Sequence, residues 1–350
     1  MKKKKILFGV AGEGMGHAAR AGIVIKHLQE QGHHVKVISY HQGYWFLKDH
    51  FDVVKIFGLR FSHKNGVTTY PGTVLENIKK TPEATATFKR LKQLVKKFQP
   101  DIIFTDLEPF SSLLAHLYKI PLISIDNQHR ITQGEVEYDK RWIVDYLLNK
   151  TGVATVAFGA QAYIITSFFD FKITHPNSYI VPPILRPEVL KAKPKNKSHI
   201  LVYNTTSETE ILIRLLQEQK NQKFIVYGQN KEESIANCIL KKQSKDGFLN
   251  DLVSAKAVIA TAGFTLISEA LYLKKPYLAL PVKRRVEQLI NAYYLRKLGY
   301  GDYTEKITSS DLESFLGNLN KFRHNLQSYN HDNNSGLFIL LNKLLAKHSL

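Results

Sequence analysis

The chain has 350 residues and a mass of 40.0 kDa, which is too long for one ordinary hydrophobic core and suits two domains. Its 44% hydrophobic and 23% charged residues exclude a wholly disordered chain, and its single cysteine, Cys238, excludes a disulfide framework and a multi-cysteine metal site. The net charge of +19 is spread evenly over both halves of the chain, which suits polyanionic partners in general or a lysine-rich proteome without such a partner.

The first half of the chain alternates predicted strands with predicted helices. Apolar runs predict strands at 6–11, 34–40, 101–105 and 121–126. Helical spacing of apolar residues predicts helices at 18–31, 85–98 and 111–118. The four lysines at 2–5 precede an apolar run that is too short for a signal peptide. This order predicts a parallel sheet with helices on both faces.

The longest uncharged stretch, 151–169, is the one candidate for a membrane span. Its two glycines, its glutamine and its threonines favour a buried helix followed by a strand at 162–168 instead.

The second half repeats the alternation after a change in composition. Residues 186–198 are poor in apolar side chains and rich in lysine and proline, which predicts a linker. Strands are then predicted at 199–203, 223–227, 257–261 and 276–280, with helices at 208–219, 265–273 and 286–298. We therefore expect an α/β fold with two doubly wound parallel-sheet domains, 1–185 and 199–335, and a C-terminal helix at 336–350. A ligand should lie in the cleft between the domains.

A glycine-rich loop follows the first predicted strand and contains Gly12, Gly14 and Gly16. Glycines let the backbone approach a ligand closely, and the helix that follows points its free N–H groups and positive dipole end at an anion. The loop does not match a dinucleotide-binding fingerprint, because its third glycine comes one residue early and the second strand ends without an acid for a ribose. The sequence contains no P-loop either.

His17 lies at the mouth of this loop, in the first turn of the predicted helix. The helix dipole disfavours the imidazolium form there, so the ring remains able to accept a proton. His17 is therefore a candidate general base, and a capping or phosphate-binding role is an equal alternative. Asp106 and Glu108 directly follow a predicted strand and should face the same cleft, as alternative bases or as groups that orient His17.

A second glycine site lies in the second half. Gly263 follows a predicted strand and Thr265 opens a helix, which makes another helix N-terminus suited to a diphosphate. Glu269 lies about one turn further on, where a carboxylate can accept hydrogen bonds from both hydroxyls of a ribose. Gln288 and Asn291 are three residues apart on the next predicted helix and can offer donors and acceptors to a sugar. An ordinary strand–helix–strand unit would explain the glycine but neither the acid nor the two amides.

These segments resemble the inverting GT-B glycosyltransferases, the group that includes the lipid-linked N-acetylglucosaminyltransferase of peptidoglycan synthesis and the UDP-glucuronosyltransferases. The carboxyl-terminal pattern 263–292, the amino-terminal loop 12–20 and the segment IDNQH at 125–129 carry the resemblance. The chain is most similar to a prokaryotic branch described as teichoic-acid-biosynthesis-like. The resemblance covers most of the chain and implies two Rossmann-like domains that face a central cleft.

The resemblance also implies roles for single residues. Phe248 and Leu249 match a loop that packs on uracil; Gly263, Phe264 and Thr265 match a diphosphate-binding turn; Glu269 matches a ribose-binding acid; Gln288 and Asn291 match donor-sugar contacts; Arg186 resembles a phosphate-contacting arginine; and His17 matches a base or phosphate ligand. Two departures concern substrates. Glu287-Gln288 stands where many relatives have two glutamines, which leaves the donor sugar open, and the amino-terminal loop lacks the form typical of the peptidoglycan enzyme.

The function expected from this resemblance is an inverting, metal-independent transfer of a sugar from a UDP-sugar to a hydroxyl acceptor, without a cofactor. The acceptor would be a lipid-linked or cell-envelope glycan. The protein would be cytoplasmic and peripheral on the inner face of the plasma membrane, with the basic helix 85–98 and the segment 140–150 resting on anionic lipid. Core packing of these helices with a solvated charged face is the alternative.

Two other functions are weaker. A UDP-N-acetylglucosamine 2-epimerase has the same fold, but its donor-half signature differs from the one present here. Nucleic-acid binding rests only on the net charge, because no nucleic-acid-binding motif occurs in the sequence.

Overall fold

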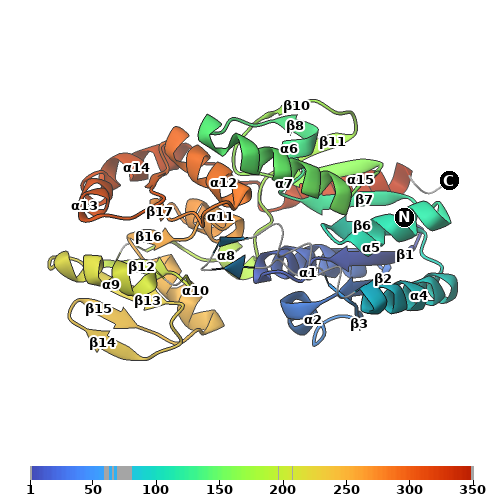
Figure 1. Cartoon of the computed structure of the whole chain (residues 1–350), viewed down its shortest axis with the longest axis horizontal. Coiled ribbons are helices and arrows are strands. Elements are labelled where there is room, and N and C mark those ends of the chain that lie inside the picture. Colours follow the sequence, from blue (N-terminus) through green and yellow to red (C-terminus); the bar gives the residue numbers. More distant parts are fainter. Residues whose placement is uncertain are drawn as a thin grey trace.

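The computed structural model describes residues 2–58, 63–64, 67–68, 81–195, 197–206 and 208–347, and it shows two α/β domains side by side (Figure 1). Residue 196 of the predicted linker and residues 348–350 of the predicted C-terminal helix lie outside the described part. Each domain is built on a seven-stranded sheet. The α/β fold expected from the alternation of elements is therefore confirmed.

The sheet of the first domain is entirely parallel. Its order is β11 (Ser178–Val181), β9 (Ala162–Thr166), β7 (Leu122–Asp126), β6 (Ile102–Asp106), β1 (Lys5–Val10), β2 (His34–Ser39) and β3 (Val53–Lys55). The central strands β6 and β7 are buried along their whole length, as expected for strands that are covered on both faces. Short antiparallel pairs lie outside this sheet: β4 (His63–Lys64) with β5 (Val67–Thr68), and β8 (Gly134–Glu135) with β10 (Lys172–Ile173).

Helices cover both faces of this sheet. The helices of the first domain are α1 (Met15–Glu30), α2 (His41–Leu47), α4 (Thr81–Phe98), α5 (Pro109–Tyr118), α6 (Arg130–Gln133) and α7 (Ile143–Val156). On one face α1 packs together with the last helix of the chain, α15 (Ser335–Lys347), through Val24 and Leu341. On the other face α4 and α5 pack through Leu91 and Leu114. The end of the chain thus returns to complete the core of the first domain.

The sheet of the second domain is parallel except for its edge strand β14. Its order is β14 (Glu233–Ile235), β15 (Cys238–Leu240), β13 (Lys223–Tyr227), β12 (His199–Tyr203), β16 (Ala257–Ala260), β17 (Tyr277–Ala279) and β18 (Gly301–Tyr303). Its helices are α9 (Thr209–Glu218), α10 (Lys245–Ser254), α11 (Phe264–Tyr272), α12 (Val286–Lys297), α13 (Ser309–Gly317) and α14 (Leu319–Asn325), and α8 (Pro187–Leu190) lies between the domains.

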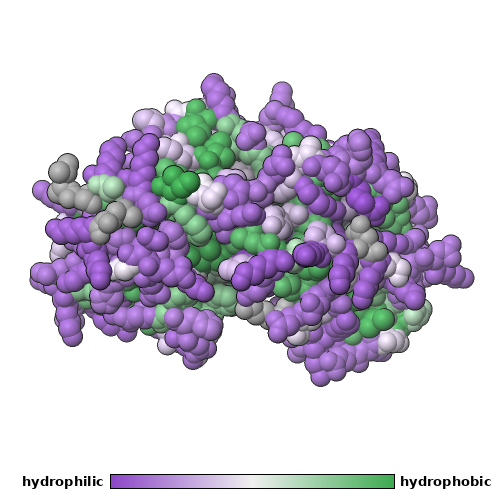
Figure 2. Space-filling view, turned by 180° about the vertical axis from the view of Figure 1, so that it is seen from behind, coloured by the Kyte–Doolittle hydropathy of each residue, from purple (hydrophilic) through white to green (hydrophobic). Residues whose placement is uncertain are grey.

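An apolar seam joins the two domains. Phe168 and Phe169 follow β9 in the first domain and contact Phe264 and Tyr294 of the second. The rings of Phe169 and Tyr294 are stacked with their centroids 3.6 Å apart, and all four side chains belong to one buried cluster. Seen from behind, most of the surface is hydrophilic, and it is indented at the lower edge where the domains meet (Figure 2).

The predicted strands and helices agree with the structure to within a few residues, with one correction. The helix expected to be buried in 151–169 is α7, which begins earlier, at Ile143. Only Tyr146 and Val153 of its residues are buried, because one side of the helix packs on the core and the other faces solvent. In the described ranges, no helix combines the length and hydropathy that a membrane span requires.

Candidate functional site

The N-termini of two helices, one from each domain, face each other. A Cβ atom added to Gly16 of α1 would lie only 2.8 Å from Oγ1 of Thr265 in α11. No side chain caps either helix, and neither first turn contains an acidic residue. The unpaired N–H groups and positive dipole ends of both helices are therefore directed at the same region, where an anion would be stabilised.

The fold requires glycine at two of three positions in these loops, Gly12 and Gly14, but not at Gly263. Gly12 lies against the backbone of Tyr40, whose carbonyl oxygen would be 1.9 Å from an added Cβ atom. Gly14 has a φ of +86°, which other residues rarely adopt. An added Cβ at Gly14 or Gly263 would meet no atom within 4 Å, so both positions border open space. Gly263 has φ −69° and ψ 131°, which any residue can adopt, so the fold itself does not require glycine there.

This geometry yields a prediction for Gly263→Ala. The free energy of unfolding should stay within about 0.5 kcal/mol of the wild type, because the new methyl group meets no protein atom. The methyl group would, however, occupy the space above the α11 N-terminus. It should therefore weaken the binding of UDP, the nucleotide expected from the sequence, about tenfold, which corresponds to about 1.4 kcal/mol. Isothermal titration calorimetry measures this change. Gly317→Ala, where an added Cβ also meets nothing, is the matched control and should bind UDP normally. Unchanged UDP binding by Gly263→Ala would mean that no phosphate approaches this turn.

His17 belongs to a tight polar cluster with Asp106 and Arg20. Arg20 donates from Nε to Oδ2 of Asp106 at 2.7 Å and from Nη2 to Oδ1 at 2.6 Å. His17 Nδ1 lies 2.8 Å from Oδ1 of Asp106 and 2.7 Å from Nη2 of Arg20. Two tautomers satisfy these contacts: Nδ1–H can donate to Oδ1 of Asp106, or an unprotonated Nδ1 can accept from Nη2 of Arg20, because a carboxylate only accepts and a guanidinium only donates. In the first tautomer Nε2 carries no proton and can act as a base, on a side chain that is 15% exposed.

Arg20 is a residue whose role the sequence reasoning missed. It is almost fully buried, and its bidentate hydrogen bonds fix the Asp106 carboxylate next to His17. The signal was its spacing, three residues after His17, which brings both side chains to one side of α1.

Glu108 does not face the cleft, contrary to expectation. Its side chain is fully buried and caps the N-terminus of α5 by accepting hydrogen bonds from the N–H groups of Phe110 and Ser111 and from the Ser111 hydroxyl. Burial raises the pKa of Glu108 to about 7, although these hydrogen bonds oppose the shift. Gly9 of β1 makes room for this cap, because an added Cβ would lie 1.7 Å from the Ser111 hydroxyl. The position of Glu108 is that of a structural cap.

Arg186 and Glu269 form an ion pair at the junction of the domains. Arg186 donates from Nε to Oε1 of Glu269 at 2.7 Å and from Nη2 to Oε2 at 3.0 Å. Glu269 is 5% exposed, and burial raises its pKa, while the hydrogen bonds and charge of Arg186 oppose the shift. The structure thus brings together the residues expected to contact phosphate and ribose, one helical turn from the α11 N-terminus.

Asn291 is also placed differently from the expectation. It is fully buried, its Nδ2 donates to the carbonyl of Ala262 at 2.9 Å, and its Oδ1 accepts from Arg130 at 2.8 Å. Both ends of the amide are therefore engaged inside the protein, where they hold the loop before α11. Gln288 accepts from the N–H group of Val282 at 2.9 Å and is 9% exposed. A contact of Asn291 with a donor sugar does not fit this geometry.

Phe248 and Leu249 lie in the first two turns of α10 rather than in a loop. Both are half-buried, and the Phe248 ring packs edge-on against Tyr203 and Tyr227 at the ends of β12 and β13. A cavity of about 570 Å³ lies beside the first turn of α10, between Gly247 and the hairpin β14–β15.

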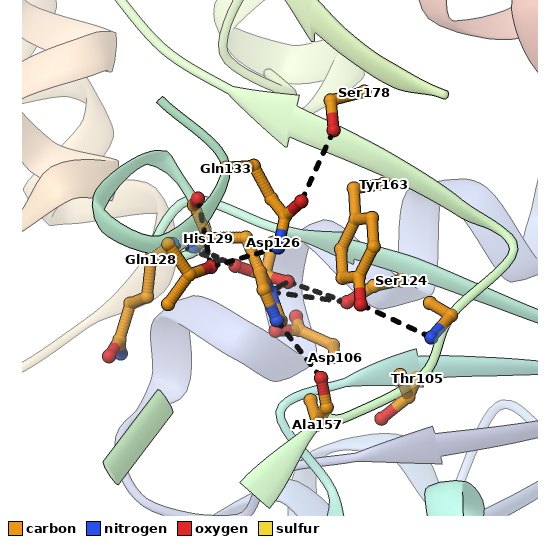
Figure 3. A network of polar contacts seen from close by, with 12 residues as sticks. Thr105, Asp106, Ser124, Asp126, Gln128, His129, Gln133, Ala157, Tyr163 and Ser178 are labelled. Atoms are coloured by element: carbon orange, nitrogen blue, oxygen red, sulfur yellow. Dashed lines mark hydrogen bonds and ion pairs between the residues drawn. The ribbon is translucent and has the colours of Figure 1, made fainter. Parts of the chain in front are cut away.

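A second buried cluster, formed by Asp126 and His129, had no role in the sequence reasoning beyond the resemblance. His129 lies between the Asp126 carboxylate and the Ala157 carbonyl, with Tyr163 beside its ring (Figure 3). Nδ1 is 2.5 Å from Oδ2 of Asp126, and Nε2 is 3.1 Å from the carbonyl oxygen. Both nitrogens face acceptors, so the ring is a buried imidazolium.

The electrostatics of this pair agree with its geometry. Burial opposes both charges, but the attraction between them prevails, so the pKa of His129 is raised and that of Asp126 is lowered. Asp126 also accepts hydrogen bonds from the Ser124 hydroxyl and from the N–H groups of Gln128 and His129. The pair therefore fixes the turn that follows β7.

This turn reaches across to the second domain. Asn127 donates to Oε1 of Glu287 at 2.8 Å, and Arg130 donates to the Glu287 carbonyl at 3.2 Å as well as to Asn291. The turn after β7 thus holds the N-terminus of α12. Within the described ranges, no group of three or more histidine, cysteine and acidic side chains is arranged to hold a metal ion.

Comparison with known proteins agrees with this architecture. Residues 4–320 match the family model described as Glycosyl transferase family 1. A protein of Methanosarcina acetivorans named "uncharacterized glycosyltransferase" is 24% identical over 335 residues, which cover 85% of this chain and 84% of that protein. The UDP-N-acetylglucosamine--N-acetylmuramyl-(pentapeptide) pyrophosphoryl-undecaprenol N-acetylglucosamine transferase 3 of Bacillus cereus is 30% identical over 92 residues, which cover 24% of this chain and 26% of that protein.

The fold is shared with solved structures. The crystal structure of MurG from Acinetobacter baumannii superposes with a TM-score of 0.63 at 20% identity, covering 97% of this chain and 99% of that one. The resemblance inferred from the sequence and the GT-B fold are thereby confirmed. The chain belongs to Glycosyl transferase family 1 and is a glycosyltransferase with the GT-B fold.

Proposed function

We propose that the protein transfers a sugar from a UDP-sugar to the hydroxyl of a lipid-linked or cell-envelope glycan, with inversion and without a metal ion or other cofactor. The observation that carries the proposal is the pair of facing helix N-termini at Gly16 and Thr265, with His17–Asp106 in the first domain and Arg186–Glu269 at the boundary with the second.

The roles follow from charge and hydrogen bonding. The N–H groups of α1 and α11 and the Arg186 guanidinium would stabilise the two phosphates, so that the developing charge on the leaving nucleoside diphosphate meets positive dipole ends and a cation. Glu269 would accept hydrogen bonds from the ribose hydroxyls. Phe248 and Leu249 would lie against the uracil.

The chemical step follows from the orientation of His17. Its Nε2 would take the proton of the acceptor hydroxyl as the acceptor oxygen attacks the anomeric carbon. The bond between that carbon and the β-phosphate oxygen breaks, UDP leaves, and attack from the opposite face inverts the configuration. Asp106 would stabilise the imidazolium that forms.

The proposed acceptor and the proposed cellular location are supported by the name of a relative rather than by the geometry of the site. The Bacillus cereus relative is named for transfer to a pyrophosphoryl-undecaprenol acceptor, which supports a lipid-linked acceptor here. Such an acceptor would place the protein in the cytoplasm, at the inner face of the plasma membrane. A role in teichoic-acid-like envelope biosynthesis is part of the same proposal.

The first experiment is calorimetry with UDP, ADP, GDP and NADH. Selective binding of UDP is the expected result and justifies a screen of acceptors in membrane extracts. Selective binding of ADP or GDP would change the donor class, and no nucleotide binding would overturn the proposal. Product analysis without an acceptor tests for an epimerase, which would change the sugar without transferring it.

Glu269→Ala tests the ribose contact. Hydrogen bonds to a charged group contribute about 1.5–3 kcal/mol, so the donor KM should rise roughly 10- to 150-fold. Wild-type protein should also bind 2′-deoxy-UDP more weakly than UDP, whereas Glu269→Ala should bind both alike. Glu188→Ala removes a neighbouring exposed acid and serves as the control. A wild-type protein that does not distinguish the two nucleotides would contradict the assignment.

A further inference from the structure

One surface of the first domain is apolar although it faces solvent. Six large side chains are 41–66% exposed there: Leu113 and Leu117 of α5, and Ile143, Val144, Leu147 and Leu148 of α7. We call these six residues the apolar face. The four residues on α7 are spaced by about one helical turn, so they form a stripe along the side of α7 opposite the buried Tyr146 and Val153. Contiguous exposed apolar side chains on two neighbouring helices mark a docking surface.

The basic helix α4 lies next to the helices that carry the apolar face. Helix α5 lies between α7 and α4 and packs against both. The buried side of α4 carries Leu91 and Val95, and its outer side carries Lys89, Arg90, Lys96 and Lys97, all exposed. Together α4, α5 and α7 carry six basic residues and two acidic ones, Glu83 and Asp145. An apolar stripe beside a row of cations has the chemistry of an interfacial segment that binds anionic lipid.

The alternative occupant is a second copy of this chain. A dimer through the apolar face would cover the six apolar side chains but would offer few acidic partners to the basic side of α4, because the three helices carry only Glu83 and Asp145 as acidic residues. An anionic lipid surface instead complements both the leucines and the lysines.

We propose that the apolar face and the basic side of α4 dock the first domain onto an anionic lipid bilayer. The inference deepens the proposed function and rests on it, because the lipid-linked acceptor is part of that proposal. Helix α5 begins three residues after Asp106, so the docked surface belongs to the half of the molecule that holds His17. Docking would hold the acceptor side of the site close to the membrane.

Vesicle flotation of the full chain tests the proposal without sugar transfer. The vesicles are phosphatidylcholine alone, or phosphatidylcholine with 30% phosphatidylglycerol. The double variant Val144→Asp and Leu147→Asp removes the apolar contact at exposed positions. Lys96→Glu with Lys97→Glu removes the basic contact. Ile339→Asp, at a side chain that is 69% exposed on α15, is the matched control for charge on an apolar surface. Thermal unfolding and UDP calorimetry on each variant show that the fold and the nucleotide site are intact.

Wild type and Ile339→Asp should float with the anionic vesicles and remain unbound with phosphatidylcholine alone. Each double variant should lower the fraction bound about tenfold or more, and the binding of the wild type should fall as salt rises. UDP binding should not change, so failure of docking is separable from failure of the proposed function. No flotation with anionic vesicles, or flotation that Val144→Asp with Leu147→Asp does not reduce, would overturn the proposal. A dimer in light scattering that this variant dissociates would assign the face to self-association instead.

Discussion

Replacing His17 by alanine should lower kcat about 10²- to 10⁴-fold and leave UDP affinity within about twofold of the wild type. The reason is that His17 is proposed to accept a proton in the chemical step, whereas other residues bind the donor. Nδ1 lies against Asp106 and Arg20, so Nε2 is the ring nitrogen that takes the proton when Nδ1–H donates to Asp106. The loss should therefore appear in the chemical step and not in donor binding. Steady-state kinetics together with UDP calorimetry separates the two parameters.

The control for this variant is His50→Gln, which changes an exposed histidine in the same domain and should leave kcat unchanged. His17 is itself partly exposed, so its removal should not unfold the protein, and a thermal melt checks this. A rise in KM with an unchanged kcat would show that His17 contacts a phosphate and is not the base. Asp106→Asn is less suitable as a primary test, because it would leave the buried Arg20 guanidinium without its anionic partner.

The sequence predicts the scaffold well because its signals are local. A buried parallel strand is a continuous apolar run, and the glycine turn after it shows that the backbone must come close to another atom. Both signals lie within about ten residues, so the two helix N-termini and the residues in their first turns were predictable. The expected position of a ligand in the cleft follows from the general rule that ligands bind at the carboxyl ends of the strands, whereas the close approach of Gly16 to Thr265 is seen only in the structure.

The directions of single polar side chains were not predictable in the same way. Asp106 ends β6 and Glu108 lies two residues further on, yet Asp106 faces His17 and Glu108 caps α5. Gly9 on the neighbouring strand leaves the space that this cap occupies. Asn291 lies inside because Arg130, which is 161 residues earlier, donates to it. No local pattern encodes a contact between residues so far apart in the chain. For that reason the Asp126–His129 pair and the turn that it supports had no functional interpretation from the sequence.

Replacing His129 by glutamine should lower the free energy of unfolding of the first domain by about 3–5 kcal/mol near pH 6, because it leaves the Asp126 carboxylate buried without its counter-charge. Urea unfolding followed by tryptophan fluorescence measures the loss selectively, since both tryptophans, Trp45 and Trp142, lie in the first domain. His175→Gln, at an exposed histidine, is the control and should leave the unfolding curve unchanged.

The same pair predicts the pH dependence of this difference. The pKa of His129 is raised in the folded state, so its contribution is complete below about 6.5, the pKa of an unfolded histidine, and is lost as pH rises through the folded value. The pKa of Asp126 is lowered, so its contribution is complete above about 3.9, the pKa of an unfolded aspartate, and is lost as pH falls through the folded value. The gap between wild type and His129→Gln should therefore be widest between about pH 4 and 6.5 and narrow above this range by up to about 1.4 kcal/mol per pH unit. A gap that stays constant from pH 5 to 9 would mean that His129 is neutral in the folded protein. In that case the turn after β7, which is hydrogen-bonded to Glu287, would be stabilised by packing and neutral hydrogen bonds rather than by a buried ion pair.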